Sequence, residues 1–131
     1  MKKLVLLFLL ITGVGFAAEA PKLAPADAAK RVAGGSAVLI DVREPSEWAA
    51  TGVVAGAVLL PKSDFDGPQK QWKEFLAKTG DKELILYCRT GHRAGIVAAA
   101  LAKQGHKVAN AGGFKDWQEA GQPVVPPKGA P

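Results

Sequence analysis

The sequence is poor in residues that bind metals or form disulfides. Of its 131 residues, one is a cysteine and two are histidines. Zinc sites take three or four soft ligands from the protein at characteristic spacings, and Cys88, His92 and His106 offer no such spacing. We therefore predict neither a metal site nor a cofactor. Because a single cysteine cannot form an internal disulfide, Cys88 is either a free thiol or an intermolecular partner.

A strong excess of one charge is also lacking. Lysine and arginine number 17 against 12 acidic residues, and the bases are spread along the chain between the acids. Nucleic-acid binding needs a clustered basic face, so nucleic acid is not a predicted partner. The mild positive charge would favour small anions.

The one long apolar run lies at the N-terminus, at residues 4–16. It follows Lys2 and Lys3, is shorter than the roughly 18–20 residues that span a bilayer, and leads into small residues. This pattern predicts a signal peptide over residues 1–17, with Ala18 as a second possible end. A membrane anchor is the alternative. Cleavage would give a periplasmic protein without stable membrane association, although the same signal would also suit export from the cell.

Apolar runs typical of buried strands alternate with segments at helical spacing. We expect strands at 37–40, 57–60, 84–87 and 107–109, and helices at 26–32, 44–50, 66–78, 93–104 and 114–120. This alternation predicts one α/β domain over residues 23–124, with a mostly parallel central sheet flanked by helices on both faces. Residues 125–131 are proline-rich and predict a flexible tail.

Polar residues follow two of the expected strands. Asp41 and Arg43 end one, and Cys88 ends another. Parallel sheets bind ligands beyond the carboxyl ends of their strands. These residues therefore predict a site at that edge of the sheet.

The segment Cys88-Arg89-Thr90-Gly91-His92-Arg93 connects a buried strand to a helix. The start of that helix directs unpaired N–H groups toward the segment, and Gly91 permits a tight anion-binding turn. Arg89 and Arg93 add two positive charges. These features favour a thiolate at Cys88, which needs no separate general base, and the same cradle would bind an anionic sulfur donor. The alternative is that Cys88 is a small buried apolar residue at the end of a strand.

Over residues 23–124 the chain resembles a rhodanese domain. Three stretches carry the resemblance: Asp41-Val42-Arg43-Glu44-Pro45 followed by Glu47-Trp48, Cys88 to Arg93, and Gly112-Gly113-Phe114 with Trp117. Its size and signal peptide resemble small periplasmic single-domain rhodaneses. The family's fold agrees with the α/β domain expected above.

The resemblance implies a thiosulfate sulfurtransferase with Cys88 as the nucleophile. Sulfur would pass from thiosulfate, or a similar small anionic donor, through a Cys88 persulfide to cyanide, a thiol or a protein acceptor. Asp41 and Arg43 would shape the pocket wall, or form a structural ion pair. The cradle for the donor and the persulfide would be formed by Arg89, Thr90, Gly91, His92 and Arg93.

Two other functions fit parts of the pattern. A phosphatase or arsenate reductase of related fold would place an arginine six positions after the cysteine, whereas Arg93 follows Cys88 by five. A persulfide carrier or sulfur-binding module with little turnover on small molecules would need the same thiolate. Thr90 stands where well-studied thiosulfate enzymes of the family have a lysine, which bears on thiosulfate affinity.

Overall fold

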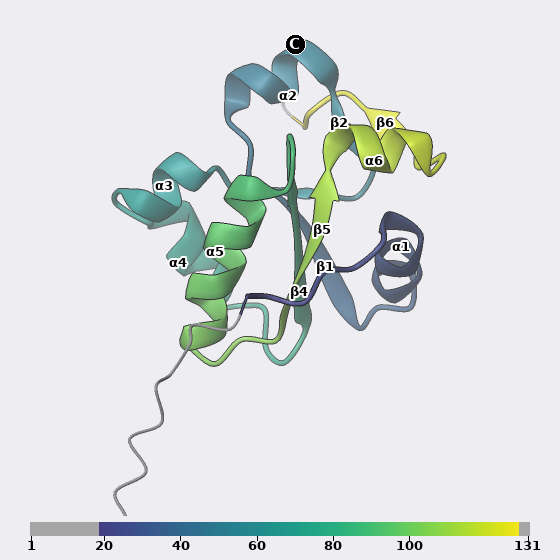
Figure 1. Ribbon diagram of the computed structural model, residues 1–131. Coiled ribbons are helices and arrows are strands. Elements are labelled where there is room, and N and C mark those ends of the chain that lie inside the picture. The colour runs from purple at the N-terminus through teal and green to yellow at the C-terminus, as the bar shows by residue number, and fades with distance from the viewer. Residues whose placement is uncertain (1–18, 129–131) are drawn as a thin grey trace, which may run out of the picture.

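The computed structural model describes residues 19–128, and the predicted signal peptide over 1–17 lies outside them. In chain order the elements are α1 (Pro25–Ala33), β1 (Ala37–Asp41), α2 (Pro45–Thr51), β2 (Val53–Val54), β3 (Val58–Leu59), α3 (Lys62–Asp66), α4 (Lys70–Leu76), β4 (Glu83–Cys88), α5 (His92–Lys103), β5 (Val108–Gly113), α6 (Phe114–Glu119) and β6 (Val124–Val125) (Figure 1). Among these helices none is long and apolar enough to cross a membrane.

Four parallel strands form the central sheet in the order β3-β1-β4-β5. Helices α3, α4 and α5 cover one face, where Trp72 and Leu101 pack against Ile40 and Leu86. Helices α1 and α6 cover the other face, where Ala28 and Trp117 belong to a second core cluster. The predicted fold class, a mostly parallel sheet flanked by helices on both faces, is confirmed.

The helix expected over residues 66–78 is wrong in its boundaries, because α3 ends at Asp66 and a separate helix, α4, covers only Lys70–Leu76. The Asp64 carboxylate in α3 accepts hydrogen bonds at 3.0 Å from the backbone N–H groups of Lys70, Gln71 and Trp72. This side chain caps α4 from outside, so α4 begins at Lys70. Gln69, just before it, takes the left-handed conformation with φ 55°.

Two strands were not expected from the sequence. Val53–Val54 (β2) and Val124–Val125 (β6) pair antiparallel in a separate small sheet. The pairing extends one residue into the segment 125–131 that the sequence assigned to a flexible tail. Strand β5 is also longer than the expected strand at 107–109, since it continues to Gly113.

A charged network is buried between the sheet and α6. Arg43 is 2% exposed and Asp41 is completely buried. The Arg43 guanidinium donates to the Asp41 carboxylate at 2.9–3.1 Å, and it lies 4.3 Å from the centre of the Phe114 ring. It also donates to the Thr51 hydroxyl and the Gly52 carbonyl, both at 2.8 Å. The ion pair therefore joins the end of β1 to the end of α2.

Tyr87 of β4 completes this network. Its hydroxyl donates to Asp41 Oδ2 at 2.5 Å and accepts the Val54 N–H at 3.0 Å. Burial raises the pKa of Tyr87 above its ordinary value, and the negative charge of Asp41 raises it further. The phenol is therefore held in its protonated form.

Tyr87→Phe should lower the free energy of unfolding by about 1–3 kcal/mol at neutral pH, because it leaves the buried Val54 N–H without a partner and removes one of the donors to the buried Asp41 carboxylate. A raised folded-state pKa also means that the wild type keeps the phenol's contribution below the ordinary pKa of 10.0 and loses it as pH rises further. Urea unfolding of both proteins at neutral and alkaline pH measures the two effects.

Tyr87 is the only tyrosine of the chain, so the ultraviolet absorbance of phenolate reports on this residue alone. The folded protein should ionise well above the ordinary phenol range. Ionisation near the ordinary value, while circular dichroism still shows a folded chain, would contradict the proposed protonation state.

Candidate active site

Cys88 ends β4, and α5 begins four residues later at His92. We call residues 88–93 the cysteine loop. The Cys88 sulfur is completely buried and accepts two backbone N–H groups, from Gly91 at 3.0 Å and from Ala94 at 3.5 Å. Gly91 has φ 96°, a conformation that side-chain-bearing residues rarely adopt. The tight turn at Gly91 thus directs amide hydrogens at the sulfur.

The cysteine loop lies directly on the end of β5. A Cβ atom placed on Gly113 would stand 2.4 Å from the Arg89 carbonyl oxygen, and one placed on Gly91 would stand 3.3 Å from Gly112 Cα. Gly113 and Gly91 are therefore required for backbone-to-backbone contact between the loop and β5. The sequence had singled out Gly112-Gly113 as a motif without identifying this role.

Arg93, in the first turn of α5, is held by Glu47 of α2. Its guanidinium donates to both carboxylate oxygens, at 2.6 and 2.8 Å. The hydrogen-bonded carboxylate raises the pKa of Arg93, with a smaller contribution from the charge of Cys88. In return, Arg93 lowers the pKa of Glu47. Glu47 was missed as a functional residue, because nothing local in the sequence connects it with a residue 46 positions away.

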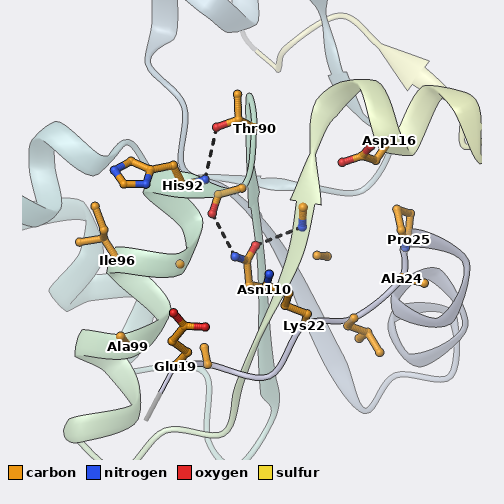
Figure 2. Close-up of a pocket in the computed structure, with 16 residues that line it drawn as sticks. Glu19, Lys22, Ala24, Pro25, Thr90, His92, Ile96, Ala99, Asn110 and Asp116 are labelled. Atoms are coloured by element: carbon orange, nitrogen blue, oxygen red, sulfur yellow. Dashed lines mark hydrogen bonds between the residues drawn. The ribbon is translucent and has the colours of Figure 1, made fainter. Parts of the chain in front are cut away.

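The other predicted loop residues are nearer solvent. Arg89, Thr90 and His92 are exposed, and the His92 N–H lies 3.4 Å from the Thr90 hydroxyl oxygen. Thr90, Gly91 and His92 line an open pocket of about 810 Å³, which also touches α5, β5 and the segment before α1 (Figure 2). Of the predicted cradle residues, Arg89 and Arg93 are not among those lining this pocket, and neither is Cys88 itself.

Asp41 and Arg43 are placed differently. Their strand is next to β4, but their side chains make the buried ion pair with Tyr87 on the face opposite Cys88. Of the two roles considered for them, the structure shows the ion pair, and they do not appear among the residues lining the pocket beside the cysteine loop. Within residues 19–128, no three His, Cys, Asp or Glu side chains gather in a way that could hold a metal ion.

Cys88 is a free cysteine at the carboxyl end of a central parallel strand, which is where α/β sheets place their ligand-binding sites. The molecule is therefore an α/β domain with a candidate active site at this cysteine. Comparison with known families makes the assignment specific. The chain belongs to the rhodanese-like domain family, whose model matches residues 24–120.

Individual relatives agree with this assignment. The probable adenylyltransferase/sulfurtransferase MoeZ of Mycobacterium tuberculosis is 40% identical over 88 residues, which are 65% of this chain and 21% of that protein. The chain therefore spans about a fifth of that relative. A sulfurtransferase of Allochromatium vinosum is 32% identical over 94 residues, covering 70% of this chain and 81% of its own.

A solved structure is also similar. The polysulfide-sulfur transferase homodimer of Wolinella succinogenes matches with a TM-score of 0.65 and 27% identity, over 84% of this chain and 81% of that chain. The likeness extends over most of both chains, so it concerns the whole domain rather than the cysteine loop alone.

The two arginines of the cysteine loop should affect Cys88 differently. The Arg93 guanidinium is fixed by Glu47 and its charge interacts with that of Cys88, whereas Arg89 is exposed and its charge is screened by salt. Arg93→Ala should therefore slow alkylation of Cys88 near neutral pH and move the alkylation profile to higher pH. Arg89→Ala should cause a smaller shift. The measurement is the rate of alkylation by neutral iodoacetamide as a function of pH. A larger shift for Arg89→Ala would contradict this division of roles.

Proposed function

We propose that the chain is a sulfurtransferase that carries sulfur as a persulfide on Cys88. The observation that supports this most directly is the pair of backbone N–H groups directed at the Cys88 sulfur, with the fixed charge of Arg93 nearby. Amide donors and a nearby cation stabilise an anionic sulfur more than a neutral thiol. A cysteine that served only as an apolar core residue would not need this cradle.

The proposed reaction has two steps. The Cys88 thiolate attacks the outer sulfur of thiosulfate, a new sulfur–sulfur bond forms, and the old one breaks with its electron pair leaving on sulfite. The acceptor, cyanide or a thiolate, then attacks the terminal sulfur of the Cys88 persulfide. The bond between the Cys88 sulfur and the terminal sulfur breaks with its electron pair returning to the Cys88 sulfur, which regenerates the thiolate. No outside oxidant or reductant is needed.

Donor choice is the finer part of the proposal. The exposed Arg89 beside the nucleophile and the mild positive charge of the chain favour a compact anion such as thiosulfate. The name of the Wolinella succinogenes relative makes polysulfide a second donor to test. We further propose that the protein works in the periplasm, because of the predicted N-terminal signal peptide.

Incubation with thiosulfate should add one sulfur atom to the protein, removable by cyanide or by a reducing agent. The intact mass of the protein measures the adduct before and after each treatment. Cys88→Ser is the matched control and should show no addition, because the chain has no other cysteine. An adduct that persists in Cys88→Ser would overturn the assignment. A persulfide that forms while thiosulfate–cyanide turnover stays near background would favour a sulfur carrier over an enzyme.

Thiosulfate should give a higher kcat/KM than mercaptopyruvate. In mercaptopyruvate-type loops of the family a glycine follows the cysteine, whereas an arginine follows Cys88 here.

Arg89→Ala should lower kcat/KM for thiosulfate, with the larger effect at low ionic strength because the exposed charge is screened by salt. Steady-state assays with each donor at two salt concentrations measure both effects. A preference for mercaptopyruvate in the wild type would contradict this reading of the loop.

A further inference from the structure

Asn110 is the only asparagine of the chain, and its side chain joins the cysteine loop to β5. Its Nδ2 donates to the Gly91 carbonyl at 3.0 Å, and its Oδ1 accepts the Gly112 N–H at 3.1 Å. Figure 2 shows both hydrogen bonds beside the pocket. The two partners fix the amide orientation, because a flipped amide would set its NH₂ group against the Gly112 N–H and its oxygen against the Gly91 carbonyl.

The backbone around Asn110 is itself fixed. Its N–H donates to the Pro21 carbonyl at 2.8 Å, and its carbonyl accepts the Leu23 N–H at 2.9 Å. On its other side it pairs with Leu86 of β4, directly before the register shifts between Leu86 and Cys88. Between the pairs Leu86–Asn110 and Cys88–Gly113, β5 has one residue more than β4. In this irregular part of the strand, the Gly112 N–H donates to the Asn110 side chain. Asn110 is therefore a fixed point from which a side chain can hold the loop.

The Gly91 carbonyl accepts two N–H groups, one from the Asn110 side chain at 3.0 Å and one from the Gly95 backbone at 2.9 Å. Glycine adopts left-handed and right-handed conformations with little difference in energy, so the residue does not by itself keep its N–H on the Cys88 sulfur. Gly95 leaves room for the Asn110 side chain, because a Cβ atom at position 95 would stand 3.2 Å from Asn110 Nδ2. Holding the Gly91 carbonyl fixes the turn whose N–H group lies 3.0 Å from the sulfur.

We propose that Asn110 is a positioning residue that keeps the Gly91 amide directed at the Cys88 sulfur. It acts through Gly91 and does not contact the reacting atoms. Its importance for sulfur transfer rests on the proposed use of Cys88 as the nucleophile. Its effect on the thiol can be measured without any transfer reaction.

The test compares three variants by the pH dependence of Cys88 alkylation with iodoacetamide, after circular dichroism has shown which are folded. Asn110→Ala removes both hydrogen bonds without adding charge. Asn110→Asp keeps an acceptor for the Gly112 N–H but loses the donor to Gly91. Ile96→Glu is the matched control, because this residue is 47% exposed on the same pocket and its side chain makes no hydrogen bond.

Both Asn110 variants should alkylate about fivefold to tenfold more slowly below neutral pH, the size expected for losing one positioning hydrogen bond. Their profiles should move to higher pH, and Ile96→Glu should shift much less. In thiosulfate turnover, kcat should fall with little change in KM, since the donor contacts are kept. A loss of stability alone would leave the alkylation profile of the folded protein unchanged.

A folded Asn110→Ala with the wild-type alkylation profile would overturn the proposal. If Asn110→Ala does not fold, Asn110→Asp decides the matter, and a shift equal to that of Ile96→Glu would overturn the proposal because charge alone would explain it. If the wild type forms no persulfide while the Asn110 variants still shift the alkylation profile, the proposed function fails and the positioning role stands.

Discussion

The structure depends on one close backbone contact, between the cysteine loop and the end of β5. Gly113 approaches the Arg89 carbonyl so closely that a Cβ atom would stand 2.4 Å from that oxygen. This contact lets the loop turn tightly at Gly91. The turn brings the Gly91 N–H to the Cys88 sulfur, and the first turn of α5 adds the Ala94 N–H. The geometry of the site therefore depends on a glycine at position 113, because any side chain there would push the cysteine loop away from β5.

The alternation of side chains along β4 separates two functions that the sequence placed together. Cys88 belongs to the core cluster beneath α5, whereas Tyr87 belongs to the cluster beneath α1 and α6. Successive residues of a strand point to opposite faces. The buried pair of Asp41 and Arg43 thus stabilises the framework from the face opposite the thiol, and the sheet lies between that charge network and the Cys88 sulfur.

The sequence predicted what depends on local pattern. Continuous apolar runs identified β1 and β4, and the cysteine loop was found from the type and order of its residues. Features that depend on distant partners were missed. The break between α3 and α4 follows from a cap supplied by Asp64, and β2 and β6 form only by pairing with each other. Glu47 and Asn110 meet the cysteine loop from 46 and 19 positions away, respectively.

These distant partners also change how the charge of the loop is understood. From the sequence, Arg89 and Arg93 contribute two positive charges beside Cys88, with Arg93 expected to have the larger effect on the thiol because it opens a helix. In the structure, the Glu47 carboxylate lies on the Arg93 guanidinium, so it offsets part of that charge while fixing its position. The two N–H groups directed at the Cys88 sulfur have no such carboxylate partner, and in the proposed reaction they would stabilise an anionic sulfur alongside Arg93. In the proposed reaction, the exposed Arg89 is therefore the arginine that would meet an incoming anion, whereas Arg93 and the two amides would act on the Cys88 sulfur itself.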